Sequence, residues 1–369
     1  MASSKKGKKK SQKSKLPAAP FKLSSEDLKL ADKRTTNICV PVGYGWKPGP
    51  FFCKKRYLKS HDWKQLAMDG ILKYCLRGLL GESQRKTFFR LLDVIRKVCS
   101  ECQESDTLPA LEKEINEVCA EIERDFPISI QTISLHIFRH SVAGIQQLGP
   151  VHGWWMYCYE RFNSWICQRV KNRRFPEATV METYRIFDWV QYMNLSGCLP
   201  SFDVDVVAEC EAPTCKVTNS SSFMNYQLTT QEIRDLNGYY GDVLTLDHAS
   251  CLQLFSIERK VHGKSHVWKA QKLDSSDSKH ISSVVQVDFG NTKHVGRVIH
   301  FLALPVSGIN KEFATIEIFT VFEQDPDSCL YFVNTLSFNV TTVPFEFISV
   351  PLVTAIDDDN EFNLWILNI

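Results

Sequence analysis

Residues 126–184 read FPISIQTISLHIFRHSVAGIQQLGPVHGWWMYCYERFNSWICQRVKNRRFPEATVMETY, and the interpretation of the whole chain depends on them. Two histidines four residues apart, His136 and His140, precede a Gly-Pro break. The aromatic segment after the break encloses a single acid, Glu160, and a run of basic residues follows it. Metal-ligating, acidic and basic side chains therefore stand close together in one stretch.

The apolar residues on both sides of this stretch recur at helical spacing. The pattern predicts helices over residues 60–81, 85–103, 108–125, 128–148, 153–172 and 177–194. The segment 128–148 is apolar nearly all round, and a helix of that kind is expected to be buried. Short breaks between the segments favour antiparallel neighbours in a bundle.

The text changes to short β-type runs separated by turn residues from Tyr239 onward. We therefore predict the α+β class, with an N-terminal all-α helical bundle followed by a C-terminal all-β barrel or sandwich module. The predicted parts are a disordered basic tail at 1–35, an extended connector at 36–56, a helical domain at 57–197, a linker at 198–236 and a β-rich module at 237–369.

Composition narrows the class of protein. The 369 residues, 44% of them hydrophobic, can supply the cores of two domains. The net charge of +2 is too small to give the whole protein a strong electrostatic field. No export signal or membrane-length apolar run is evident, so the 13 cysteines are expected to be mostly free thiols in the nucleus or cytosol.

The first fifteen residues carry seven lysines and no acid. Such a block repels itself and is typical of a disordered tail that addresses a protein to the nucleus or contacts nucleic acid. We expect a nuclear location, or a cytoplasmic one if the tail is not a targeting signal. The candidate nucleic-acid contacts in the tail are Lys5, Lys6, Lys8, Lys9 and Lys10.

A structural zinc site is one interpretation of two spaced pairs. His136 and His140 stand at i and i+4, and Cys99 and Cys102 form a Cys-x-x-Cys pair upstream. The alternative is that all four are core residues, since both pairs lie in apolar helical patterns. We expect no other cofactor.

Glu160 has aromatic neighbours in sequence, and a buried carboxylate has to be paired, bound to a metal or neutral. It could serve as one acid of a metal-dependent phosphoryl-transfer site or form a salt bridge between helices.

The acidic run 357–359 lacks the spaced ligands of an EF-hand, so we expect a solvated turn there.

A second basic group closes the aromatic segment. Its members are Arg169, Lys171, Arg173 and Arg174. Positive charge at a helix C-terminus favours the macrodipole, and the same residues could contact phosphates.

Two stretches resemble CACTA (En/Spm-type) transposases. The segment 58–81, LKSHDWKQLAMDGILKYCLRGLLG, is similar to a motif of that family. The sequence from Cys99 to Glu177 is similar to the helical domain of unknown function that follows this motif in the family, and it contains the run GPV…WMY.YERF…VKNR..PE. The resemblance covers about residues 57–195. It implies that Glu160 corresponds to the third metal-binding acid of a DDE site, and that His136 and His140 correspond to a structural zinc pair.

The chain also departs from that family. The catalytic aspartates are expected upstream of residue 58, where the text is basic, and Lys64 stands where the family often has a histidine. We therefore expect a transposon-derived protein without autonomous nuclease or transposase activity. DNA and a protein partner stay open as partners, or Glu160 could complete a DDE site in trans; no membrane or small-molecule substrate is expected.

Overall fold

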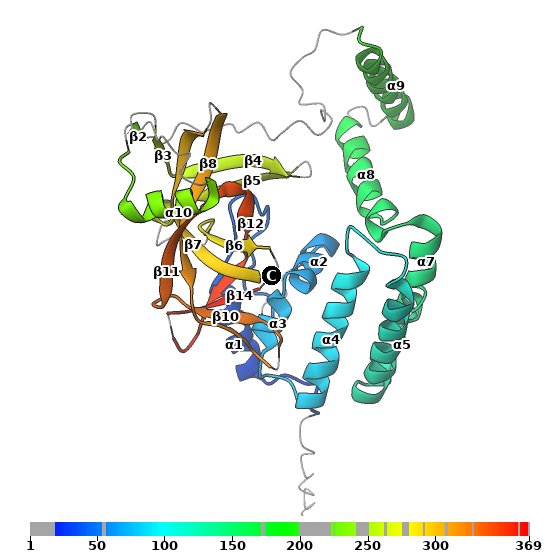
Figure 1. The fold of residues 1–369 in the computed structure, drawn as a ribbon. Helices are drawn as coiled ribbons and strands as arrows, with labels where there is room; N and C mark the ends of the chain where they lie inside the picture. The colour runs from blue at the N-terminus through cyan, green and yellow to red at the C-terminus, as the bar shows by residue number, and fades with distance from the viewer. Residues whose placement is uncertain are drawn as a thin grey trace, which may run out of the picture.

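The computed structural model describes residues 19–53, 57–170, 174–198, 223–224, 226–240, 251–261, 264–274, 280–290, 292–306, 309–326, 328–360 and 362–367. The fold is mixed α+β, with most helices in the N-terminal half and antiparallel strands in the C-terminal half (Figure 1). The α+β prediction is confirmed at this level, but no barrel is closed by the strands described. No described helix has the length and hydropathy needed to span a membrane.

The segment predicted as one helix over 60–81 forms two helices that meet at Gly70, and the other predicted segments overlap observed helices. The structure describes ten α-helices. They are α1 (Ser25–Thr36), α2 (Ser60–Met68), α3 (Ile71–Leu76), α4 (Glu82–Val98), α5 (Leu108–Asp125), α6 (Ile133–Phe138), α7 (Ser141–Leu148), α8 (Tyr157–Arg169), α9 (Pro176–Leu195) and α10 (Thr230–Tyr240), with 3-10 turns η1 (Ile128–Ile130) and η2 (Val151–Gly153) between them.

The strands form two main antiparallel sheets and one hairpin. The first sheet has the order β1 (Ile38–Cys39), β13 (Thr354–Ile356), β14 (Asn363–Ile366), β10 (Tyr331–Asn334), β9 (Phe322–Gln324). The second has the order β11 (Phe338–Pro344), β8 (Ile309–Phe319), β7 (Thr292–Val306), β3 (Leu252–Leu254), β2 (Phe223–Met224), and β6 (Val284–Phe289) pairs with both β7 and β12 (Ile348–Pro351). The hairpin joins β4 (Ser256–Val261) to β5 (Lys264–Lys269).

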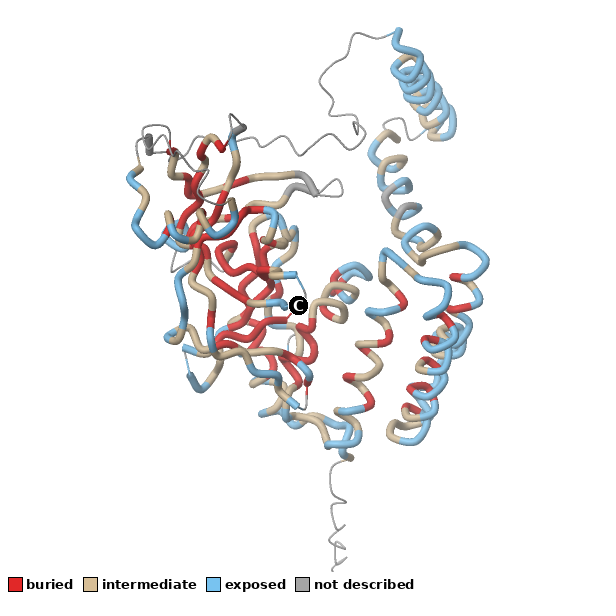
Figure 2. Tube along the Cα trace, in the orientation of Figure 1, coloured by how far each residue is buried: buried red, intermediate tan, exposed pale blue. Residues whose placement is uncertain are grey.

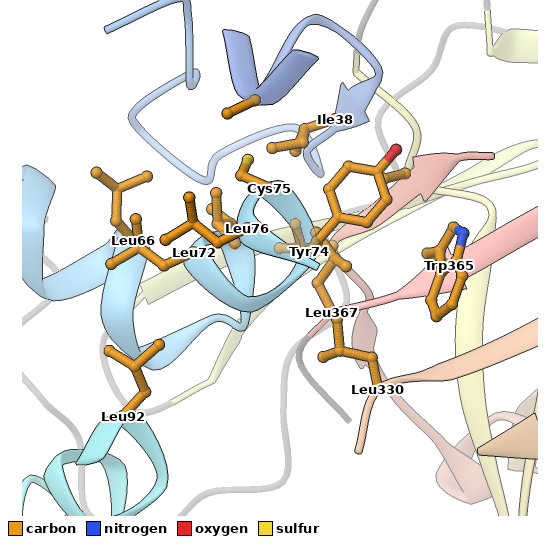
Figure 3. Packing of buried hydrophobic residues seen from close by; sticks show 14 of the residues in the cluster. Ile38, Leu66, Leu72, Tyr74, Cys75, Leu76, Leu92, Leu330, Trp365 and Leu367 are labelled. Carbon is orange, nitrogen blue, oxygen red and sulfur yellow. The ribbon is translucent and has the colours of Figure 1, made fainter. Parts of the chain in front are cut away.

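The N-terminal elements complete the core of the C-terminal sheet. Strand β1 pairs with β13, so that Ile38 lies opposite Ala355. Helices α2 and α3 bury their apolar side chains against β10 and β14, and Tyr74 and Trp365 lie in this cluster (Figure 3). Residues at opposite ends of the chain therefore share one hydrophobic core, whose formation is expected to be the main driving force for joining them.

A second core holds the helical bundle together. The apolar stripes of α4 and α5 face each other, and α7 packs against them. The residues buried there include Val94, Val98, Leu111, Ile115, Val118, Cys119, Val142 and Ile145. The stripe predicted over 108–125 is confirmed, because the residues buried on α5 recur every three or four positions. On α4 only Leu92 and Val98 of the predicted apolar stripe are buried.

The predicted boundaries differ from the observed ones at two places, and the connector between them is ordered. The tail was expected to be disordered through residue 35, whereas α1 begins at Ser25, after a capping box formed by Ser24 and Asp27. The connector is held in place because the Asp32 carboxylate accepts hydrogen bonds from the backbone N–H groups of residues 51–53. The linker was expected to reach residue 236, whereas α10 begins at Thr230.

The predicted buried helix over 128–148 is wrong. The chain there forms η1, α6 and α7, with a turn at Arg139 and His140 between the two α-helices. A single short helix cannot bury apolar residues on every face against one neighbour. The turn lets Val142 and Ile145 reach the bundle core, while α6 has no buried residue.

Candidate nucleic-acid interface

Helix α8 carries an aromatic and basic stripe toward its C-terminal end. Phe162, Trp165 and Arg169 stand at i, i+3 and i+7, so they lie on one face of the helix. The rings of Phe162 and Trp165 are stacked, with centroids 5.8 Å apart and an interplanar angle of 5°. This stripe is the surface on which the α8–α9 hairpin is built.

Helix α9 packs onto that stripe through aromatic rings of its own. Tyr184 meets Phe162 edge to face at 6.4 Å, and Phe187 meets Trp165 at 5.4 Å. Such edge-to-face pairs are each worth roughly 0.5–1.5 kcal/mol beyond the area they bury. The hairpin is therefore held by ring contacts, and it extends away from the sheets (Figure 1).

The junction between the two helices presents cations on aromatic platforms. The Arg169 guanidinium lies 3.9 Å from the Trp165 ring centroid, and its Nη1 donates to the Trp165 carbonyl at 3.0 Å. The Arg174 guanidinium lies 5.4 Å from the ring of Phe175, and both of these residues are exposed. Guanidinium groups oriented in this way can contact phosphates, and the exposed ring of Phe175 can stack on a base.

The other predicted nucleic-acid contacts fall outside the described residues. These are Lys5, Lys6, Lys8, Lys9 and Lys10 in the tail, and Lys171 and Arg173 in the junction. Of the predicted contacts, the structure therefore places Arg169 and Arg174 at the two ends of one junction.

Glu160 does not have the environment expected for it. It lies exposed in the first turn of α8, where a carboxylate interacts favourably with the positive end of the helix macrodipole. Within the described part of the chain no group of three His, Cys, Asp or Glu side chains could hold a metal ion. Of its aromatic neighbours in sequence, Phe162 contacts Tyr184 of α9, and Trp155 and Tyr157 contact Lys64.

The predicted zinc ligands are not brought together. The rings of His136 and His140 are 5.0 Å apart in an edge-to-face arrangement, at the junction of α6 and α7. Cys99 is the C-cap residue of α4. Burial raises the pKa of its thiol, and the positive charge of Lys64 on α2 offsets only part of that increase. Cys102 is exposed in the following loop, and among the described residues the four side chains form no metal site.

Lys64 is a positioning residue that the sequence did not reveal. Its Nζ lies 3.7 Å from the centroid of the Trp155 ring and 5.7 Å from that of Tyr157. This cation–π contact ties α2, at the edge of the sheet core, to the start of α8. The i, i+4 spacing of Trp165 and Arg169 is a signal that could have indicated the related contact within α8.

The comparison with protein families bears on this same region. Residues 98–197 match the family described as "Domain of unknown function (DUF4218)". A DUF4218 domain is therefore present, and it runs from the end of α4 to just past α9. No curated protein and no solved structure matches the chain. The candidate interface between α8 and α9 lies within the DUF4218 domain.

Proposed function

We propose that this chain is a nuclear nucleic-acid-binding protein derived from a CACTA-type transposase. The DUF4218 domain, which is typically found in plant transposase-like proteins, supports the transposase-related origin. The resemblance of residues 58–81 to the transposase motif supports the CACTA assignment. In this proposal the chain binds nucleic acid and does not cleave it.

The observation that carries the binding role is the basic and aromatic junction between α8 and α9. Arg169 rests on Trp165 and Arg174 lies by Phe175, so two cations stand beside two large rings. A guanidinium group that stacks on a ring can still donate from its edge toward phosphate oxygens. Lys171 and Arg173, between them in the sequence, raise the charge of the junction further.

Glu160 takes no catalytic role in this proposal. A two-metal phosphoryl-transfer site needs carboxylates that converge on the metal ions. Glu160 is exposed on α8, and the described residues provide no second and third ligand beside it. Glu160→Gln is accordingly expected to leave DNA affinity within about twofold, since a carboxylate neutralises no phosphate.

Equilibrium binding of the full chain to a short fluorescent duplex tests the proposal. Arg169→Ala with Arg174→Ala should raise Kd by about tenfold for each phosphate that the protein no longer neutralises near 0.1 M salt. Lys113→Ala with Lys293→Ala removes the same charge from α5 and β7 and serves as the matched control. Equal affinities for the two double variants, or no binding by the unaltered chain, would contradict the proposal.

The lysine tail is tested separately in the same assay. Replacing Lys5, Lys6, Lys8, Lys9 and Lys10 by glutamine removes five charges without shortening the chain. If the tail alone binds DNA, this variant loses affinity while the junction variant does not. If the junction binds as proposed, the junction variant loses affinity whether or not the tail is charged.

A further inference from the structure

Phe175 presents an exposed aromatic ring where the α8–α9 junction ends. The residue is 56% exposed, and α9, which begins next to it, is exposed along most of its length (Figure 2). Its backbone is nevertheless fixed. The Phe175 carbonyl accepts hydrogen bonds from the backbone N–H of Thr179 at 3.3 Å and from the Thr179 hydroxyl at 3.1 Å. Pro176 follows as the first residue of the helix, so the ring stands on a fixed helix end and is open to solvent.

The other large ring beside the junction, that of Trp165, is already engaged within the hairpin. It stacks on Phe162 and meets Phe187 edge to face. Among the described residues, the only ring or cation contact of Phe175 is with Arg174, whose guanidinium lies 5.4 Å from the ring centroid. A ring has two faces, and one cation covers one of them at most. A face of Phe175 is therefore available for a planar group of a partner.

The bases of a duplex offer no open face to such a ring. Each base is stacked on its neighbours, so a side chain reaches a base face only after the base is unstacked or flipped out, which costs free energy. The bases of a single strand are available without that cost, and they stack on aromatic side chains. Proteins that wedge a ring into a duplex offset the cost by wrapping the bent DNA on a wide surface. A hairpin of two helices that extends away from the sheets does not provide one (Figure 1).

We infer that the α8–α9 junction prefers a single strand of nucleic acid to a duplex, with one base stacked on Phe175 and phosphates of the same strand neutralised by Arg169 and Arg174. This inference rests on the proposed function, because it specifies the class of nucleic acid that the same junction binds. Arg174 acts in two ways, since its guanidinium also lies beside the ring and cation–π attraction adds to the stack. A duplex is bound through its phosphates alone.

Equilibrium binding of the full chain to a fluorescent oligodeoxyuridylate, alone or annealed to its complement, tests the inference. At raised salt, where phosphate contacts are screened and stacking is not, the single strand should bind at least about fivefold tighter, the low end of what one stacked base contributes. Phe175→Leu keeps an apolar side chain but removes the aromatic face, so it should lose this preference, whereas Phe175→Trp should keep it. Phe338→Leu replaces another exposed phenylalanine, at the start of β11, and as the matched control should retain the preference.

A strand that carries the same phosphates without bases separates stacking from charge. Phe175→Leu should raise the Kd for the oligodeoxyuridylate at least about fivefold, and the Kd for the abasic strand several times less, because no base is there to stack. Oligouridylate differs from the DNA strand only in its 2′-hydroxyl groups. Whichever of these two strands binds more tightly identifies the natural ligand as DNA or RNA, since both offer the same base faces and phosphates.

Three results would overturn the inference and leave the proposed function standing. They are a duplex bound as tightly as the single strand, a Phe175→Leu variant that keeps the preference of the Phe338→Leu control, and equal losses on the strands with and without bases. Circular dichroism of each variant shows that it is folded, as expected for replacements of exposed side chains. Absence of binding to every one of these probes by the unaltered chain would contradict the proposed function itself, so the two failures are distinguishable.

Discussion

Arg34 of α1 and Asp358, 324 residues later, form an ion pair with an Nε–Oδ2 distance of 2.9 Å. Both side chains are nearly inaccessible to solvent, and the Asp358 carboxylate also accepts a hydrogen bond from Asn37. Arg34 Nη1 donates to the carbonyls of Cys75 and Arg77 at the end of α3. The two residues therefore fasten α1 and α3 to the loop that joins β13 to β14.

Removing one partner of this pair should be costly. Asp358→Ala leaves the Arg34 guanidinium buried without its carboxylate, and breaking such a pair costs about 3 kcal/mol or more. Urea unfolding of the full chain measures the change. Lys86→Ala breaks an exposed pair with Glu82 on α4 and should change stability by at most about 0.5 kcal/mol. An Asp358→Ala effect no larger than this control would show that the pair does not hold the termini together.

Gly70 is the point where α2 ends and α3 begins, and we expect it to tolerate no side chain. Its φ is +68°, and an added Cβ would lie 2.3 Å from the Leu367 carbonyl oxygen just after β14. Gly78 has a similar φ of +71° with nothing within 4 Å of an added Cβ. Gly78→Ala should cost about 1–2 kcal/mol from backbone strain alone, and Gly70→Ala clearly more. Equal losses in thermal unfolding would contradict the close approach of the two segments.

The features that the sequence predicted are those that local patterns determine. The stripe of α5 was predicted over residues 108–125, and Ile115 and Val118 are fully buried as its spacing requires. Helix α1 was missed although the Ser24–Asp27 capping box was readable. The run 357–359 was expected to be a solvated turn, because nothing local indicates that Arg34 lies opposite Asp358. Pairing across the whole chain depends on tertiary packing, which no short window contains.

In the candidate site, too, local sequence predicted some features, and others depend on tertiary packing. The basic residues at 169–174 were recognised from composition, but the platforms under Arg169 and Arg174 were not. Glu160 and the zinc ligands were assigned by resemblance and by spacing along the chain. Spacing of four residues places His136 and His140 near each other, but it cannot bring Cys99 and Cys102 to the same point. Convergence of ligands from separate elements has to be seen in three dimensions.

The buried Glu232 should make stability depend on pH in the acid range. Burial raises its pKa, but hydrogen bonds from His300 and Thr229 outweigh burial and lower the pKa from 4.5 to about 2. A carboxyl whose pKa is depressed in the folded state contributes stability above pH 4.5 that is lost as pH falls toward 2. Urea unfolding between pH 6 and pH 3 should show this loss. Glu232→Gln should flatten that part of the profile, and an unchanged profile would contradict the assignment.

The contact between Lys64 and Trp155 should couple α2 to the start of α8. A double-mutant cycle with Lys64→Met and Trp155→Leu isolates the pair, and we expect a coupling of about 1 kcal/mol for a cation 3.7 Å from the ring. The same cycle with Lys97 and Trp155 serves as a control, since Lys97 pairs with Glu114. A coupling indistinguishable from that control would mean that the two parts of the chain are joined by other contacts.

The salt dependence of DNA binding tests the central claim most directly. The logarithm of the association constant should fall linearly with the logarithm of the salt concentration, by about 0.9 for each phosphate contacted. Arg169→Ala with Arg174→Ala should reduce that slope by about two, while Lys113→Ala with Lys293→Ala leaves it unchanged. A slope near zero for the unaltered chain, or the same slope for both double variants, would contradict the assignment of the α8–α9 junction as a nucleic-acid interface.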